Sequence, residues 1–201
     1  MKAIILAAGM GTRLGKYTKN LPKCMLNFNG KPIIEQQIKT LRSLGVNDIT
    51  IVKGYMPEKI KILGVKNYIN EDYTHTNMVE TLFTAVEELN GEVLVCYADI
   101  IYQKEILQKI IESKVDVGVT VDENYWDYWQ ARMDNPEEDM ESLVLNSDGK
   151  IVKLGDTNCK RNEANLRYVG LIKFSKFGVE KLKDVYYKNR EMFYDNEEPW
   201  L

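Results

Sequence analysis

Two cations beside a glycine-containing loop give this chain the chemistry to bind phosphate groups. The loop covers residues 6–13 and ends at Arg13, and Lys23 follows directly after a proline. Glycine lets the backbone turn sharply, so that amide N–H groups can face a phosphate. Arg13 can bind phosphate oxygens with a bidentate guanidinium, and Lys23 adds a compact charge. We therefore expect catalytic roles for Arg13 and Lys23, in a nucleotide-binding loop formed by Leu6, Ala7, Ala8, Gly9, Gly11, Thr12, Arg13 and Lys23.

Two well-known phosphate loops do not fit this segment. A P-loop needs a glycine, four residues and then Gly-Lys-Ser/Thr, and the chain has no such string. A dinucleotide-binding loop needs a third glycine where Leu14 stands, and an acidic residue where Lys53-Gly54 follows the second predicted strand. Hydride transfer on NAD is therefore only a weak alternative. An ordinary strand-to-helix turn is the simplest alternative, but it would not require Arg13 and Lys23.

Asp99 is the carboxylate placed to complement these cations. It follows the apolar run at residues 93–97. A carboxylate at that position can bind Mg²⁺, which offsets the charge of phosphate oxygens. An aspartate that only forms a turn is the alternative. We predict Asp99 as a catalytic and metal-binding residue and Mg²⁺ as the cofactor.

The elements that would hold these residues follow an alternating pattern of strand and helix. This pattern predicts an α/β fold, with a Rossmann-like, mainly parallel mixed sheet flanked by helices on both faces. Ligands of such sheets bind at the carboxyl ends of the strands, where the glycine loop, Gly54-Tyr55 and Asp99 all fall. The predicted strands are residues 2–6, 48–52, 92–97 and 115–121, and the predicted helices are residues 32–44, 77–89 and a segment around 107–111.

The chain changes character after residue 121. Residues 122–142 contain eight acids and one base, interleaved with aromatic residues. Short apolar runs at 143–145, 151–154 and 168–174 predict a small antiparallel extension, and a helix is expected at 177–187. We predict one domain over 1–201, with a nucleotide-binding core at about 1–121 and an acceptor-binding part at about 122–201.

Composition narrows the possible functions. The 201 residues are 44% hydrophobic and 28% charged, which is typical of a globular protein. A net charge of −3 argues against nucleic acid as a partner, and no apolar stretch approaches the length of a membrane span. The three cysteines are odd in number and widely spaced, which suits a reducing compartment, so we expect a cytoplasmic protein.

The glycine loop and Pro22-Lys23 resemble the motif of the nucleotidyltransferase superfamily that includes sugar-1-phosphate and choline-phosphate enzymes. The resemblance continues through residues 52–55, 76–79, 96–100 and 170–174. It implies a fold like that of nucleotide-diphospho-sugar transferases. It also implies base recognition by Thr76, Asn77 and Met78, although Thr76 or Asn77 could equally cap the helix that follows.

The resemblance is closer to CTP-dependent cytidylyltransferases of phosphonate and phosphoglutamine pathways than to sugar enzymes. That subgroup combines the Thr-Asn-Met-Val string with a Trp-rich segment, which here includes Trp126, Trp129, Arg132 and Glu141. Aromatic faces and acids could hold an amine-bearing acceptor, and Arg132 could bind a carboxylate or phosphate. A solvated acidic helix with aromatics packed on the core is the alternative. Asn135 stands where the subgroup usually has an aspartate before proline.

The pattern also implies a second metal-binding acid near the C-terminus. Either Asp195 or Glu197 takes this role, or the chain printed here is cut short before it.

We therefore expect an Mg²⁺-dependent cytidylyltransferase. It would transfer CMP from CTP to phosphoglutamine, 2-aminoethylphosphonate or phosphocholine, with release of pyrophosphate. A sugar-1-phosphate nucleotidyltransferase and a non-catalytic nucleotide-binding regulatory subunit are the alternatives. CTP and the acceptor are the expected partners, without nucleic acid or membrane, and a homodimer is left open.

Overall fold

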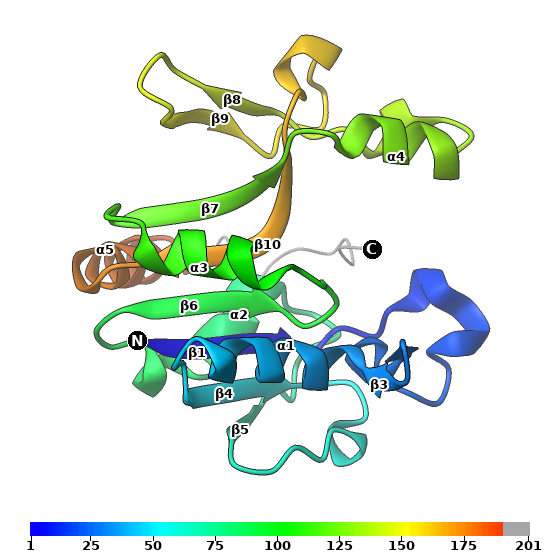
Figure 1. Ribbon diagram of the computed structural model, residues 1–201, viewed down its shortest axis with the longest axis vertical. Coiled ribbons are helices and arrows are strands. Elements are labelled where there is room, and N and C mark those ends of the chain that lie inside the picture. Colours follow the sequence, from blue (N-terminus) through cyan, green and yellow to red (C-terminus); the bar gives the residue numbers. More distant parts are fainter. Residues whose placement is uncertain (191–201) are drawn as a thin grey trace. The chain divides into compact units, whose positions relative to one another are not determined.

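A six-stranded mixed sheet organises the protein, whose computed structural model describes residues 1–190 (Figure 1). The strand order is β5-β4-β1-β6-β10-β7. β1 pairs in parallel with β4 and β6, β4 pairs in parallel with β5, and β10 runs antiparallel to β6. The fold class predicted from the sequence is confirmed. The strands are β1 (Lys2–Ala7), β4 (Asp48–Lys53), β5 (Lys66–Ile69), β6 (Val93–Tyr97), β7 (Val117–Asp122) and β10 (Arg167–Phe174).

The central parallel strands end at the same edge of the sheet. Ala7 of β1 is in register with Lys53 of β4, and Leu6 is in register with Tyr97 of β6. The loops that leave these three strands therefore start side by side. We call this side of the sheet the carboxyl edge.

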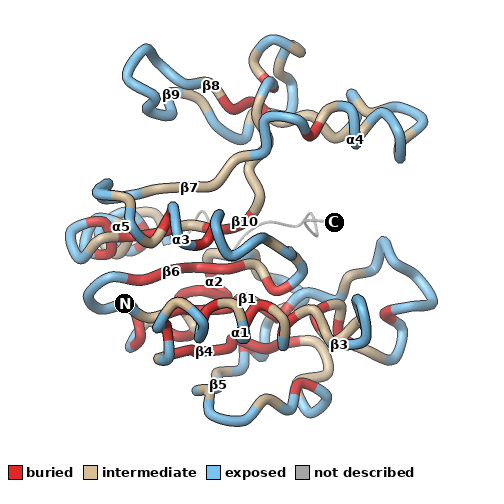
Figure 2. The backbone as a smooth tube through the Cα atoms, in the orientation of Figure 1, coloured by how far each residue is buried: buried red, intermediate tan, exposed pale blue. Residues whose placement is uncertain are grey.

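Helices cover both faces of the sheet because the central strands are apolar on both sides (Figure 1). Alternate side chains of a strand point to opposite faces, so Ile5 and Ile4 of β1 belong to two separate core clusters. Figure 2 shows buried residues concentrated along β1, β4 and β6. Helices α1 (Ile33–Ser43) and α3 (Lys104–Glu112) pack on the first cluster, and α2 (Met78–Phe83) and α5 (Lys176–Lys188) pack on the second.

One predicted helix is shorter than expected. The helix predicted at residues 77–89 ends at Phe83, the backbone leaves helical geometry at Ala85 (φ −106°, ψ 37°), and the 3₁₀ turn η4 (Val86–Glu88) follows. The break serves tertiary contacts, because the Glu88 carboxylate accepts hydrogen bonds from Lys2 at 2.9 Å and Lys66 at 2.8 Å. The helical spacing of apolar residues gives no information about such contacts, so it predicted a longer helix.

The chain forms two compact units. Among the described residues, the first unit contains Met1–Gly118 and residues 170–190, and the second is Val119–Val169. The division into a core at about 1–121 and an acceptor-binding part at 122–201 stays a prediction. Elements of the second unit include α4 (Tyr125–Arg132), η5 (Pro136–Asp139), η6 (Arg161–Glu163) and the antiparallel pair β8 (Leu143–Leu145) and β9 (Ile151–Leu154).

Smaller elements complete the first unit. Asn29 and Gly30 both have positive φ and turn the chain between β2 (Asn27–Phe28) and β3 (Lys31–Pro32). Three 3₁₀ turns are η1 (Thr12–Tyr17), η2 (Lys23–Met25) and η3 (Pro57–Lys59). Among residues 1–190, no helix is long and apolar enough to cross a lipid bilayer.

Candidate active site at the carboxyl edge

Lys23 and Asp99 form an ion pair at the carboxyl edge. The Lys23 Nζ lies 2.5 Å from Asp99 Oδ2, and each side chain is 34% exposed. Lys23 begins η2, and Asp99 follows β6, so the pair joins two segments distant in sequence. An ion pair with this exposure contributes only roughly 0–1 kcal/mol to stability. Lys23 and Asp99 can therefore separate and contact a substrate instead at a small cost in free energy.

The glycine loop presents a row of unpaired backbone donors. Within residues 1–190, the amide N–H groups from Gly9 through Arg13 have no hydrogen-bond acceptor. Successive amides without an acceptor are free to donate to an anion. Gly11 has φ +64°, a conformation that favours glycine. Arg13 is exposed and has no ion-pair partner in the described part of the chain.

Hydrogen bonds from neighbouring segments hold the loop in this shape. Thr18 Oγ1 donates to Gly11 O at 2.8 Å, and Tyr55 Oη donates to Lys19 O at 2.8 Å. The backbone of Tyr55 also donates to Ala8 O at 3.0 Å. The loop is therefore supported before any ligand binds, which reduces the conformational entropy lost on binding.

Gly54 allows the loops after β1 and β4 to approach closely. A Cβ atom at this position would lie 2.8 Å from both the Cβ and the carbonyl oxygen of Ala8, and 2.7 Å from the Cβ of Tyr73. None of these three atoms can move away without moving the backbone. Glycine at position 54 is thus a packing requirement, which the sequence pattern indicated only by its place after a strand.

The predicted base-recognition segment lies at the start of α2. Asn77 Oδ1 accepts from the backbone amides of Val79 at 2.8 Å and Glu80 at 3.3 Å, so Asn77 caps the helix. Its Nδ2 group has no acceptor among the described residues. Thr76 is held by Asn70, whose Nδ2 donates to Thr76 Oγ1 at 2.9 Å. The cap leaves the Asn77 amide donors available, and their role toward a base stays a prediction.

In the second unit, arginines cover the tryptophan faces of α4. The Arg161 guanidinium lies 4.0 Å from the Trp126 ring centroid, and the Arg132 guanidinium lies 4.5 Å from that of Trp129. Trp129 Nε1 also donates to Asp139 at 2.8 Å. The acids expected to face an acceptor amine are engaged as well, because Arg167 pairs with Asp139 and Glu141 at 3.4 and 3.8 Å.

Arg132 differs from the other two arginines of this cluster. Arg167 has carboxylate partners, and Arg161 donates to Ala164 O and Asn165 Oδ1. Arg132 is exposed and has no carboxylate partner within residues 1–190. The sequence did not predict that Arg161 and Arg167 contact the tryptophan rings, since no local pattern links them to tryptophans more than 30 positions away.

The residues present suit one divalent cation bound together with phosphates. Mg²⁺ commonly takes one or two carboxylates and completes its coordination with water and substrate oxygens, and Asp99 offers such a carboxylate beside the unpaired amides. No group of three or more potential metal ligands occurs in the described residues. Asp195 and Glu197, the candidates for a second metal-binding acid, lie outside the described residues.

The fold and the phosphate-binding chemistry available at the carboxyl edge define the class of protein: it is a nucleotidyltransferase. The chain belongs to the MobA-like NTP transferase domain family, which matches residues 3–138. The resemblance drawn from the glycine loop is thereby confirmed.

Several proteins to which the chain is similar are named as cytidylyltransferases. The chain is 38% identical to the CTP:phosphoglutamine cytidylyltransferase of Campylobacter jejuni, over 98% of this chain and 82% of that protein. It is 37% identical to the 2-aminoethylphosphonate cytidylyltransferase of Lancefieldella rimae, over 51% of this chain and 44% of that protein. Among solved structures, CTP:phosphocholine cytidylyltransferase from Streptococcus pneumoniae matches with a TM-score of 0.71 and 28% identity, over 96% of this chain and 79% of the other.

Proposed function

We propose that this protein is a Mg²⁺-dependent cytidylyltransferase that transfers CMP from CTP to phosphoglutamine or a closely similar acceptor and releases pyrophosphate. The observation that carries the proposal is the row of unpaired amides from Gly9 through Arg13 beside Lys23 and Asp99. It supports a site for a triphosphate. The three named relatives all transfer a cytidylyl group, which supports CTP as the donor.

The reaction needs no nucleophile from the protein. A phosphate oxygen of the acceptor attacks the α-phosphorus of CTP, the bond to the β-phosphate oxygen breaks, and pyrophosphate leaves. The chain contributes positioning and charge stabilisation. The loop amides and Arg13 hold the phosphates, and Lys23 stabilises the negative charge that builds on them.

Asp99 would hold the metal ion. Mg²⁺ bound there would supply positive charge that offsets the charge of the phosphates. Lys23, whose present partner is the Asp99 carboxylate, would then be available to the phosphates of CTP. The apo ion pair thus keeps two opposite charges compensated until substrate arrives.

Asn77 is proposed to recognise the cytosine. Its Oδ1 is committed to the helix cap, and its Nδ2 can donate to an acceptor on the base. Thr76 and Met78 are proposed to line the same position. The cap fixes the side-chain rotamer, so the donors are oriented without further loss of entropy.

The arginine stacks favour an acceptor that carries a carboxylate. A quaternary ammonium group binds to open aromatic faces, but the faces of Trp126 and Trp129 are already covered by guanidinium groups. Arg132 can bind a carboxylate in bidentate geometry. Phosphoglutamine has such a group and phosphocholine lacks one, so we propose phosphoglutamine ahead of the phosphonate and choline compounds.

A pyrophosphate-release assay with a panel of substrates tests the proposal. CTP, UTP, GTP and dTTP are each combined with phosphoglutamine, 2-aminoethylphosphonate, phosphocholine and a sugar 1-phosphate. We expect the highest kcat/KM for CTP with phosphoglutamine. Preferred turnover of UTP or dTTP with the sugar would favour a sugar-1-phosphate enzyme, and CTP binding without turnover of any acceptor would favour a non-catalytic nucleotide-binding subunit.

Arg132→Ala tests the acceptor assignment within the same assay. Loss of a charge-assisted hydrogen bond costs about 1.5–3 kcal/mol, so the KM for phosphoglutamine should rise by about tenfold or more. The KM for CTP should stay within twofold. Gln130→Ala, an exposed substitution on the same helix, is the control and should change neither constant. An unchanged phosphoglutamine KM in Arg132→Ala contradicts the assignment.

The proposal extends to a cytoplasmic location, which is supported by three free cysteines, Cys24, Cys96 and Cys159. A homodimer stays a prediction, and sedimentation of the purified protein would decide it.

A further inference from the structure

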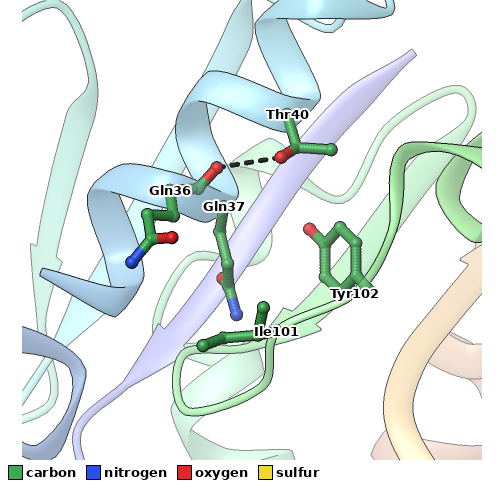
Figure 3. Close-up of a pocket in the computed structure, with 5 residues that line it drawn as sticks. All are labelled: Gln36, Gln37, Thr40, Ile101 and Tyr102. Atoms are coloured by element: carbon green, nitrogen blue, oxygen red, sulfur yellow. Dashed lines mark hydrogen bonds between the residues drawn. The ribbon is translucent and has the colours of Figure 1, made fainter. Parts of the chain in front are cut away.

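Gln37 is a polar side chain in the middle of the core face of α1. It is only 2% exposed and lies among the apolar residues Ile34, Ile38 and Leu41 of the same helix. Figure 3 shows its amide extending from α1 toward the segment that carries Ile101. A buried amide without partners would be strongly unfavourable, so the hydrogen bonds of this side chain show what it holds.

The Gln37 amide holds the backbone on both sides of Asp99. Its Nε2 donates to Tyr97 O at 2.8 Å and to Ile100 O at 2.5 Å. The same segment is also bound to the sheet, because the backbone amide of Ala98 donates to Leu6 O of β1 at 3.1 Å. The two residues between the Gln37 contacts, Ala98 and Asp99, are therefore fixed by one helix and one strand.

The same helix also supports the segment that carries Lys23. The amide of Ile33, at the start of α1, donates to Leu26 O at 3.1 Å, and Leu26 follows η2 directly. Cys24, next to Lys23, lies in the core cluster that contains Ile34 and Ile38. Helix α1 is thus a common support for both members of the Lys23–Asp99 pair.

Packing alone does not explain a glutamine at this position. Its Oε1 is buried and has no hydrogen-bond partner within the described residues, which is unfavourable for a buried carbonyl. A cavity of about 90 Å³ lies beside it, lined by Gln36, Gln37, Thr40, Ile101 and Tyr102 (Figure 3). The segment after Asp99 also packs against the core through Ile100 and Tyr102. The two Gln37 hydrogen bonds are the contacts that fix the carbonyls on both sides of Asp99.

We propose that Gln37 is a positioning residue for Asp99, which holds the Tyr97–Ile100 segment so that the carboxylate is placed to bind the metal ion with CTP. This inference rests on the proposed function, since it assumes that Asp99 binds a divalent metal with the nucleotide. Gln37 itself contacts no substrate. Its effect is carried by two backbone carbonyls.

Gln37→Met tests the proposal, because methionine has nearly the same length and volume but cannot donate. Residues that orient a metal ligand typically change metal affinity by about 10–100-fold when replaced. The Mg²⁺ concentration for half-maximal turnover should therefore rise by about tenfold or more. In calorimetry, the gain in CTP affinity produced by Mg²⁺ should shrink, whereas CTP binding in EDTA should stay within twofold of the unmodified protein.

Gln36→Met is the matched control. Gln36 is the neighbouring residue on α1 and also donates to two backbone carbonyls, Phe28 O at 2.7 Å and Lys31 O at 3.1 Å, but these do not flank Asp99. Its metal dependence and its Mg²⁺-linked CTP affinity should stay within twofold. Gln37→Leu, which also lacks a donor and cannot ionise, replaces Gln37→Met if that variant does not fold, and the same shift is expected.

The outcomes separate the positioning role from the function on which it rests. A lower melting temperature in Gln37→Met with unchanged metal dependence would overturn the positioning role and leave the cytidylyltransferase proposal intact. Full turnover of the unmodified protein in EDTA would overturn the metal role of Asp99 and the positioning role with it. A shift in Mg²⁺-linked CTP affinity supports the positioning role even if no acceptor is turned over.

Discussion

At the scale of single residues, Lys23 and Asp99 hold opposite charges that the substrate and metal are expected to take over. Their side chains are equally exposed and meet at 2.5 Å, so neither is desolvated without compensation. A buried pair would be costly to open, because each separated charge would lack both water and partner. The exposure of this pair makes it suitable for exchange rather than for stability.

Lys23→Ala is expected to reduce kcat by at least about 10²-fold, as is typical when one group that stabilises transition-state charge is removed. The free energy of unfolding should change by no more than roughly 1 kcal/mol, since the ion pair is exposed. Steady-state kinetics and urea unfolding measure the two effects. Lys19→Ala is the control, because Lys19 lies four residues before Lys23, is exposed, and its side chain has no ion-pair partner in the described residues.

Asp99→Ala should give an equal or larger loss of turnover with the fold retained. Activity of Asp99→Ala within threefold of the unmodified protein would exclude the carboxylate from the reaction. Loss of activity in Lys19→Ala would show that general positive charge on the loop, rather than Lys23, is what matters.

At the scale of elements, we expect the short helix α2 to couple stability to nucleotide choice through Asn77. Its carbonyl oxygen caps the helix and its amide nitrogen faces no described acceptor. The Asn77 carbonyl oxygen therefore stabilises the helix, while its amide N–H groups are available to donate to a base. Two substitutions can separate these roles because aspartate is as good a cap as asparagine but lacks the amide donors.

Asn77→Ala should lower the free energy of unfolding by about 0.5–2 kcal/mol through loss of the cap. Asn77→Asp should keep the stability and still raise the KM for CTP, because a carboxylate cannot donate to the base. Thermal unfolding and initial-rate kinetics check both. A CTP KM that rises only in Asn77→Ala would mean that Asn77 is a cap and nothing more.

The elements also show which parts of the structure the sequence could predict. β1, β4 and β6 are apolar on both faces and were found from their composition, and the glycine loop is a local motif. β5 was missed because its residues are mostly exposed and polar, Lys66–Ile69, and its pairing with β4 determines its place. The end of α2 near Ala85 depends on the contacts of Glu88, which no local pattern records.

The same reasoning applies to the site. Lys23 and Asp99 were predicted together because both follow elements of a parallel sheet whose ends must coincide. The arginines on the tryptophan faces were not predicted, since Arg161 reaches Trp126 from a distant turn. Gln37 was not predicted either, because a single polar residue in an amphipathic helix gives no indication of the backbone it contacts.

At the scale of the whole first unit, charge clusters occupy both edges of the sheet. Lys2, Asp48 and Lys66 begin β1, β4 and β5, and they meet Glu88 at the edge opposite Lys23 and Asp99. Burial would raise the pKa of Glu88, but its hydrogen bonds with Lys66 and Lys2 outweigh burial and lower it. We therefore expect stability and substrate binding to depend on separate clusters.

The Glu88 cluster makes stability depend on pH. Because the pKa of Glu88 is lowered in the folded state, its contribution is fully present above its ordinary value of 4.5 and is lost as pH falls through the folded pKa. Glu88→Gln should therefore be less stable than the unmodified protein at pH 7, and the difference should shrink below about pH 4.5. Urea unfolding across pH measures it.

Because Glu88 lies opposite the site, kcat of Glu88→Gln at pH 7 should stay within twofold. Glu105→Gln, on the exposed side of α3, is the control for removing a carboxylate. A stability difference that does not narrow in acid would contradict the role given to the Glu88 carboxylate.

The burial of Cys24 next to Lys23 has a consequence for chemical reactivity. Burial raises the pKa of Cys24 and of Cys96 to about 12. Since the thiolate is the reactive form, a thiol reagent should modify either residue only when the surrounding structure opens. Cys24 lies in η2, next to Lys23, and Cys96 lies inside β6, so the two report different openings.

Alkylation followed by mass spectrometry would measure these openings, with the half-buried Cys159 as an internal reference. We expect modification of Cys24 to be faster than that of Cys96, and CTP to slow it by holding Lys23. Equal rates for both, unaffected by CTP, would mean that the loop opens only when the sheet unfolds. Two buried thiols therefore provide separate chemical measures of motion at the loop and in the sheet.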